Sequence, residues 1–86
     1  MIRIKLHKNF EKSYVKLTEV QKTRFKERRD LFLKDQFNPI LNNHALKGGY
    51  LGYRSINITG DLRAIFKILG EDVTFVAIDS HSNLYG

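Results

Sequence analysis

The sequence predicts a single α+β domain over residues 1–86, in which an N-terminal strand and a two-helix hairpin pack on an antiparallel β-sheet. Two features of the chain indicate this fold class. The hydrophobic pattern has a helical period over most of the first half and a period of two over most of the last third. All six glycines lie in the second half, where a meander of short strands has to turn. A chain of this length is too short for two independent cores.

The N-terminal half is predicted to form a strand followed by two helices. Residues 2–6 alternate isoleucine and leucine with basic residues, as a half-buried strand does. After Lys8, apolar residues recur at helical spacing up to Thr18, which indicates a short amphipathic helix. Residues 18–37 contain no glycine or proline, and Thr18 is a favourable N-cap, so a second helix is expected there. The apolar arc of this helix, expected to face the core, consists of Val20, Phe25, Leu31 and Phe32.

The C-terminal half is predicted to be a three-stranded meander. Residues 37–52 contain the only proline and are expected to form a loop, with one helical turn at Pro39. Strands are expected over residues 53–59, 62–69 and 73–78, joined by tight turns. In the first two strands, the face toward the core should carry Ile56, Ile58, Leu62, Ala64, Phe66 and Ile68. The opposite face is expected to be open and to carry Tyr53, Ser55, Asn57, Arg63, Ile65 and Lys67.

The charge of the chain favours a polyanionic partner. The sequence has 15 Lys+Arg against 9 Asp+Glu, which gives a formal net charge of +6 and a pI near 9.8. Such a charge on a small surface attracts nucleic acid first and an acidic protein second. The lack of cysteine excludes disulfides and thiolate metal sites, and no apolar run is long enough for a secretory signal or a membrane span. We therefore expect a soluble cytoplasmic protein with no membrane partner.

Two of the three histidines flank the predicted meander. His44 precedes it and His81 follows its last strand, so the topology is expected to bring both imidazoles to one cleft beside Asp61 and Arg63. RNA supplies its own nucleophile, the ribose 2′-hydroxyl. Cleavage then requires removal of that proton, protonation of the departing 5′-oxygen and stabilisation of the phosphorane charge. Imidazole exchanges protons near neutral pH, and a guanidinium bonds phosphate oxygens in pairs. This set is chemically sufficient for RNA cleavage without a metal or any other cofactor.

The same residues also have ordinary structural interpretations. An exposed histidine such as His7 is usually just surface, an aspartate after a glycine is a common turn residue, and Arg63 could keep an open sheet face soluble. Tyr85 could stack on a splayed base, donate its hydroxyl, or cover the core. A metal site at His44 and His81 lacks the supporting carboxylate or cysteine spacing, so none is predicted.

Two motifs resemble a known family of bacterial toxins. The segment HALKGGYLGYRSINITGDLRAIFKI (44–68), followed after a short strand by DSHSNLYG (79–86), is similar to the C-terminal half of the RelE-superfamily toxins of type II toxin–antitoxin modules, nearest the YafQ branch. In that branch, His-x-Leu-x-Gly precedes a Gly-Tyr-Arg strand, an aspartate opens the next strand, and the chain ends in His-Ser-x-Leu-Phe or a close variant. The order and spacing of these pieces carry the resemblance.

The resemblance implies an mRNA interferase that cuts messenger RNA in the ribosomal A site, next to 16S rRNA. It also implies a cognate antitoxin that neutralises the toxin, with operator DNA contacted only through the antitoxin complex. Position by position, the active-site residues of the branch correspond to His44, Asp61, His81 and Tyr85, and Arg63 stands where many relatives keep a phosphate-stabilising arginine. Asp61 or His44 would take the 2′-proton, and His81 would be the general acid. Contacts to RNA are expected from Lys47, Tyr53, Arg54, Asn57 and Lys67.

Two positions depart from the pattern of the branch. Asn57 stands where the branch often has a further histidine, and Leu62 where it often has a tryptophan. The departures are compatible with weak activity, an altered sequence preference, or a catalytic role moved onto Arg63. Two other functions remain open from the sequence: a ParE-like toxin that inhibits DNA gyrase without cutting RNA, and a catalytically weak RNA- or antitoxin-binding domain.

Overall fold

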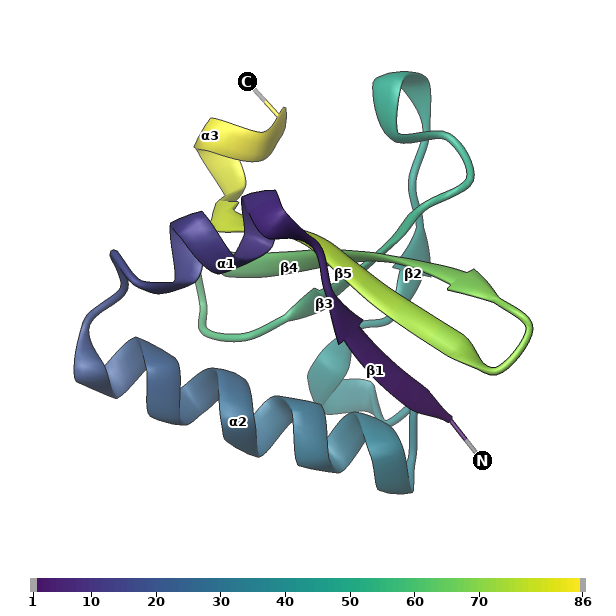
Figure 1. The fold of residues 1–86 in the computed structure, drawn as a ribbon, viewed down its shortest axis with the longest axis horizontal. Coiled ribbons are helices and arrows are strands. Elements are labelled where there is room, and N and C mark those ends of the chain that lie inside the picture. The colour runs from purple at the N-terminus through teal and green to yellow at the C-terminus, as the bar shows by residue number, and fades with distance from the viewer. Residues whose placement is uncertain (1, 86) are drawn as a thin grey trace.

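The computed structural model describes the backbone of residues 2–85 and the side chains of residues 2–84. In chain order, the elements are β1 (Arg3–Leu6), α1 (Lys8–Tyr14), α2 (Glu19–Lys34), the 3₁₀ turn η1 (Pro39–Leu41), β2 (His44–Ala45), the 3₁₀ turn η2 (Gly48–Tyr50), β3 (Arg54–Asn57), β4 (Leu62–Leu69), β5 (Asp72–Ser80) and α3 (His81–Tyr85). The strands of this described part form a five-stranded sheet in the order β1-β5-β4-β3-β2 (Figure 1). The predicted α+β class is confirmed.

The sheet contains the predicted meander and one additional strand at the edge. β3, β4 and β5 pair antiparallel in sequence order, and β1 runs parallel to β5 at one edge. At the opposite edge, β2 pairs antiparallel with β3, and His44 stands opposite Ser55. Two residues are too few to show a period, so the sequence pattern gave no indication of β2.

Two helices begin at side-chain caps and bury aromatic rings against the sheet. Thr18 Oγ1 accepts the Gln21 N–H at 3.1 Å while the Thr18 N–H donates to Gln21 Oε1 at 2.9 Å, a capping box that starts α2. The α1 N-cap is His7, whose Nδ1 accepts the Asn9 N–H at 3.0 Å. The buried aromatic cluster consists of Phe10, Phe25, Phe32, Phe66 and Phe75. Each buried ring contributes about 1.5–3 kcal/mol to stability.

Three expectations about the helical arc and the core are wrong. Val20 is 72% exposed, because with about 100° per residue it lies about 140° around α2 from Phe25. Ile68 is 43% exposed, since the β4–β5 hairpin extends past the helices (Figure 1). The second helix ends at Lys34 instead of Phe37, because Asp35 leaves the helical conformation. None of the helices between residues 2 and 85 combines the length and hydrophobicity needed to cross a bilayer.

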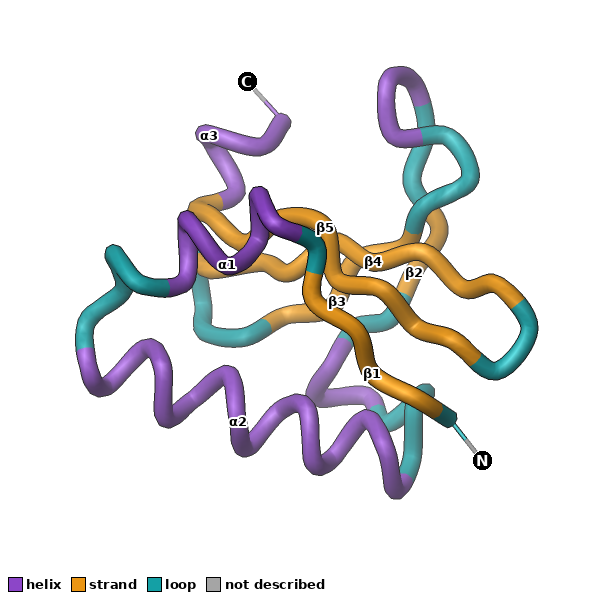
Figure 2. Tube along the Cα trace, viewed as in Figure 1, coloured by secondary structure: helices purple, strands orange, loops and turns teal. Residues whose placement is uncertain are grey.

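The sheet face away from α2, here called the far face, is partly covered and does not form the open surface that was expected. Figure 2 shows α2 on one side of the sheet, with α3 and the segment containing η2 rising on the other. Ser55 and Ile65 belong to the far face by strand alternation, and both are 0% exposed. Leu46 on this side is buried as well. The segment 46–53, here called the covering segment, therefore closes the middle of this face. At the two ends of this face, Arg63 is half-buried and Lys67 is exposed.

Candidate active site

The polar C-terminal string is folded into a helical turn by its own side chains. Ser80 Oγ accepts the Asn83 N–H at 3.2 Å, as an N-cap does, and α3 therefore starts directly where β5 ends. Asp79 Oδ1 accepts both the Ser80 N–H at 2.7 Å and Asn83 Nδ2 at 3.0 Å. These bonds fix His81 at the first position of α3. A serine that can act as an N-cap, Ser80, was the sequence signal for this helix, which was not predicted.

A backbone hydrogen bond places His81 beside the turn between β3 and β4. The His81 N–H donates to the Asp61 carbonyl oxygen at 2.9 Å. Thr59 Oγ1 fixes the turn by accepting the Leu62 N–H at 3.0 Å and the Asp61 N–H at 3.4 Å. His81 and Asp61 are both exposed, so a predicted acid and a predicted base lie at neighbouring, accessible backbone positions.

Arg63 is held at the same turn through only one of its nitrogens. Its Nη1 donates to the carbonyl oxygens of Thr59 at 3.1 Å, Gly60 at 3.0 Å and Leu62 at 3.4 Å. Nε and Nη2 have no hydrogen-bond partner among the described residues, and no carboxylate there forms an ion pair with this guanidinium. Strand register places Arg63 opposite Asp79. The Arg63 guanidinium is thus fixed in orientation, and its Nε and Nη2 can donate to an anion.

The structure therefore brings together Asp61, Arg63 and His81, which we call the catalytic edge after the roles expected of them from the family resemblance, and it does not bring His44 to them. His44 stands on β2, level with Ser55, so that β3 and β4 separate it from β5. Three strand spacings amount to about 14 Å across the sheet. The expectation that both imidazoles enter one cleft beside Arg63 is thus corrected, because the chain before the meander pairs with β3 as an edge strand.

The ring of His44 is nevertheless oriented. Its Nδ1 lies 2.7 Å from the Asn42 carbonyl oxygen. A carbonyl only accepts, so the proton of the neutral ring resides on Nδ1 and the lone pair on Nε2. His44 is exposed, and this nitrogen can accept a hydrogen bond from a ligand that crosses the sheet edge.

The residues predicted to contact RNA divide between the two faces of the sheet. Lys67 Nζ lies 5.8 Å from the centroid of the Tyr53 ring on the far face. Lys47 is exposed in the covering segment. Asn57 stands opposite Arg63, and its buried Oδ1 has no hydrogen-bond partner in the described part of the chain. These four residues lie on or above the far face.

Arg54 lies on the other side of the sheet, with the helices. Its Nε donates to Asn43 Oδ1 at 2.8 Å, and its guanidinium lies 5.6 Å from the centroid of the Phe37 ring. The alternation that directs Ile56 toward the core also directs Arg54 to that side, so the sequence contained the signal. Tyr85 ends α3, and its side chain lies outside the described part.

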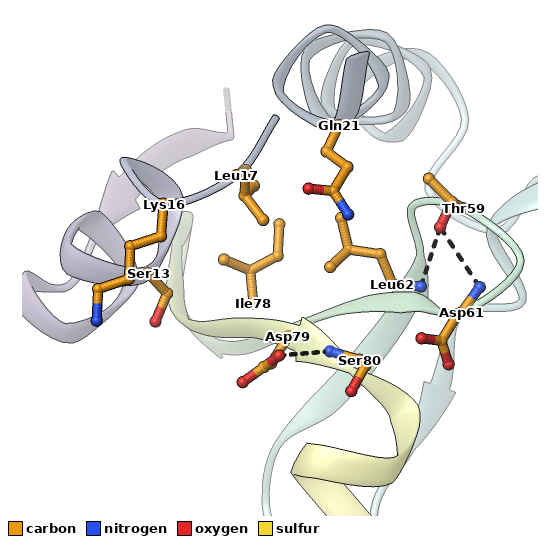
Figure 3. Close-up of a pocket in the computed structure, with 10 residues that line it drawn as sticks. All are labelled: Ser13, Lys16, Leu17, Gln21, Thr59, Asp61, Leu62, Ile78, Asp79 and Ser80. Carbon is orange, nitrogen blue, oxygen red and sulfur yellow. Dashed lines mark hydrogen bonds between the residues drawn. The ribbon is translucent and has the colours of Figure 1, made fainter. Parts of the chain in front are cut away.

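A cavity of about 340 Å³ borders the catalytic edge. Figure 3 shows Leu17, Leu62 and Ile78 at its centre, with Asp61, Asp79 and Ser80 along the side near α3. Gln21 reaches in from α2, where its Oε1 is engaged by the capping box. Within the described side chains, no group of three or more histidines, aspartates or glutamates could hold a metal ion.

The fold is shared by solved structures of YafQ and of a YoeB/ParE toxin. The crystal structure of YafQ from E. coli strain BL21(DE3) superposes with a TM-score of 0.80 at 21% identity, covering 100% of both chains. YafQ in the E. coli DinJ–YafQ complex gives 0.78 at 22% identity, again over 100% of both chains. The YoeB/ParE toxin from Agrobacterium tumefaciens gives 0.74 at 16% identity over 93% of this chain and 99% of that one. The fold is that of the RelE-superfamily toxins.

The sequence itself defines the branch. The profile of the family described as "Bacterial toxin of type II toxin-antitoxin system, YafQ" matches residues 2–86. The chain therefore belongs to the YafQ family of type II toxin–antitoxin toxins. No curated protein matches it in sequence.

Proposed function

We propose that this toxin is a ribosome-dependent endoribonuclease that cuts messenger RNA by attack of a ribose 2′-hydroxyl on the adjacent phosphate. The observation that carries the proposal is the catalytic edge, where Asp61, Arg63 and His81 lie together on an exposed end of a basic domain. The roles expected from the family resemblance fit these positions.

In the proposed reaction, Asp61 accepts the proton of the 2′-hydroxyl as the 2′-oxygen forms its bond to phosphorus. Nε and Nη2 of Arg63 bond the phosphate oxygens while negative charge builds up. His81 donates a proton to the 5′-oxygen as the bond from phosphorus to that oxygen breaks. The products are a 2′,3′-cyclic phosphate and a free 5′-hydroxyl, so no water is consumed in this step. His44 and Asn57 contact the strand on either side of the cut.

The proposed partners are the ribosome with its message, and a cognate antitoxin. A net charge of +6 favours both RNA and an acidic antitoxin segment. E. coli YafQ is known in complex with DinJ, which supports an antitoxin for a toxin of the same family. Cleavage of messages on ribosomes would take place in the cytoplasm, and operator DNA would be reached through the antitoxin.

The proposal is tested by adding purified toxin to translating ribosomes and mapping the message ends by primer extension. Wild-type protein should give cuts in register with codons, and the upstream fragments should end in 2′,3′-cyclic phosphate. His81→Ala should abolish the cuts. His7→Asn is the matched control, since asparagine keeps the cap of α1 and the residue lies away from the catalytic edge.

A second candidate function is inhibition of DNA gyrase without RNA cleavage, the ParE-like alternative that the sequence left open. The YoeB/ParE toxin from Agrobacterium tumefaciens shares the fold. Intact messages together with inhibited gyrase supercoiling, unchanged in His81→Ala, would replace the nuclease with this function.

A further inference from the structure

A second hollow lies on the far face, between the covering segment and α3. Its volume is about 300 Å³. The elements that surround it are α1, η2, β5 and α3, and its lining consists of Asn9, Ser13, Tyr50, Val76, Ala77, Ile78, Asp79 and Leu84. Figure 1 shows η2 and α3 rising on either side of the sheet surface that forms its floor. We call it the far-face pocket.

The walls of the far-face pocket suit a flat, apolar ring. Tyr50 forms one wall, and its ring packs edge-on against Tyr53, with 6.2 Å between centroids and an angle of 83°. Lys67 Nζ lies 5.8 Å from the centroid of the Tyr53 ring. Leu84 supplies the opposite wall, and Val76 lies at the floor. An aromatic wall of this kind stacks on nucleobases without regard to their sequence.

The polar groups of the far-face pocket add a preference among bases. Asp79 Oδ1 is occupied by the two bonds that hold α3, whereas Oδ2 has no partner among the described residues. The side-chain amide of Asn9 and the hydroxyl of Ser13 are likewise without partners there. A carboxylate oxygen only accepts, so it favours a base with an exocyclic amino group. Adenine, cytosine and guanine carry such a group, and uracil does not.

The far-face pocket adjoins the catalytic edge. Asp79 lines the pocket and stands opposite Arg63 in the β4–β5 register. His81 follows Asp79 by two residues. A strand whose phosphate sits at Nε and Nη2 of Arg63 therefore has a neighbouring base within reach of the pocket.

We infer that the far-face pocket is a nucleobase subsite, in which Tyr50 stacks on a base next to the cut and Asp79 Oδ2 accepts from its exocyclic amino group. The inference rests on the proposed RNA substrate, and it adds which part of the RNA the toxin recognises, namely a base next to the cut. Tyr50 and Asp79 are specificity residues under this assignment and take no part in proton transfer.

Binding of uncleavable RNA to the full-length chain tests the subsite. The probes are hexanucleotides of adenosine, cytidine or uridine with 2′-O-methyl groups, which remove the nucleophile. In NMR titrations, the adenosine probe should shift the amides of Val76, Ala77 and Leu84. Tyr50→Ala should weaken its affinity about tenfold, a change in line with the loss of one stacked base, and Tyr50→Phe should keep it. Leu51→Ala is the matched control, because Leu51 is 76% exposed on the same segment and does not line the pocket.

The base preference supplies the second arm. The uridine probe should bind several-fold more weakly than the adenosine probe. Asp79→Asn keeps an oxygen for the bonds to α3 and adds an amino donor, so it should raise uridine binding relative to adenosine. The subsite would be overturned if wild type and Tyr50→Ala bound the adenosine probe equally well. It would also be overturned if the NMR shifts were confined to other surfaces, or if the three probes bound with the same affinity.

Failure of the subsite and failure of the nuclease are separable. If Tyr50→Ala and Asp79→Asn cut messages on ribosomes at the same codons and rates as wild type, the subsite fails while the nuclease stands. If the probes bind as described but no message is cut, the subsite stands and the nuclease fails. Loss of antitoxin binding in Tyr50→Ala, without any change in RNA binding, would assign the pocket to the antitoxin and overturn the inference.

Discussion

Charged side chains are paired at one end of β5, whereas Arg63 near the other end has no carboxylate partner among the described residues. At the start of β5, Arg3 Nε donates to Asp72 Oδ1 at 2.7 Å, and Lys5 Nζ lies 3.2 Å from Asp72 Oδ2. The hydrogen bonds from Arg3 and then Lys5 hold the pKa of the Asp72 carboxyl below its usual value. At the other end, Arg63 is held by uncharged carbonyl oxygens of its own turn.

This difference in charge pairing indicates that one end of β5 contributes to stability and the other end is available for function. The start of β5 pairs with β1 and β4 and satisfies its charges internally. Beyond the end of β1, the last part of β5 pairs only with β4, and positive charge there is positioned without being neutralised. The first arrangement joins the terminal strand to the sheet, and the second leaves a guanidinium without a carboxylate partner among the described residues, which the proposed function assigns to the RNA phosphate.

Removing the aromatic core at the start of β5 should have the largest effect on stability. Phe75 is 0% exposed and packs against the rings of Phe10 and Phe66. Phe75→Ala should lower the free energy of unfolding by about 3–5 kcal/mol through lost burial and a cavity. Urea denaturation measures it. Ile68→Ala, at a half-exposed position of the same hairpin, should cost far less, and equal losses would contradict this assignment of the core.

Changing the cation at the other end should affect activity and leave the fold in place. Arg63→Lys keeps the charge but loses the planar fork, so cleavage on ribosomes should fall about 100-fold, the scale of losing a transition-state donor. The free energy of unfolding should change by only about 1 kcal/mol. A parallel collapse of the melting temperature would mark Arg63 as structural.

Much of the fold was predictable from the sequence, because its signals are local. The helical period of Phe25 and Phe32 and the alternation of Ile56 and Ile58 each depend on neighbours in the chain. Asp61 and His81 were also placed correctly at the ends of adjacent strands. The pairing of His44 was not predictable, since it depends on which strand a two-residue segment meets.

The covering of the far face could not be predicted either, because it also depends on contacts between segments that are distant in the sequence. Whether residues 46–53 fold over the sheet or away from it is decided by long-range packing, which shows in the burial of Leu46 and Ile65 and in the hollow that Tyr50 lines with residues of β5. Alternation can assign Ile65 to a face, but it cannot show what covers that face. Tyr50 was missed because it has no motif of its own, and only its place in the lining of the far-face pocket beside β5 draws attention to it.

Removing the N-cap of α3 should produce a smaller effect, on both stability and cleavage activity. Ser80→Ala removes the oxygen that accepts the Asn83 N–H, which should cost about 1 kcal/mol of stability, as the loss of an N-cap does. Cleavage should slow as well, because His81 loses its fixed place. Ser82→Ala is the control, since it removes only the 3.4 Å contact to Ser80 Oγ and keeps the oxygen that accepts the Asn83 N–H. Slower cleavage in the control alone would contradict the role of the cap.

The charge cluster at the start of β5 should give the smallest effect, visible as a pH dependence. The pKa of Asp72 is lower in the folded state than in the unfolded state, so its ionised form favours folding. This contribution is fully present above the usual aspartate pKa of about 3.9 and disappears as the pH falls through the lower, folded value. Asp72→Asn should therefore be less stable than wild type at neutral pH, and the gap should close in acid. A gap that stays constant from neutral pH into acid would exclude this ion cluster as the source.

The role of His81 as the acid can be tested with a single substrate change. A message in which sulfur replaces the 5′-bridging oxygen at the cleaved linkage has a leaving group that needs no proton. Ribosomes programmed with this message should be cut by His81→Ala at nearly the wild-type rate, while Arg63→Lys stays slow on both messages. If His81→Ala is equally slow with sulfur and with oxygen, His81 does not protonate the leaving group, and the catalytic edge does not act as described.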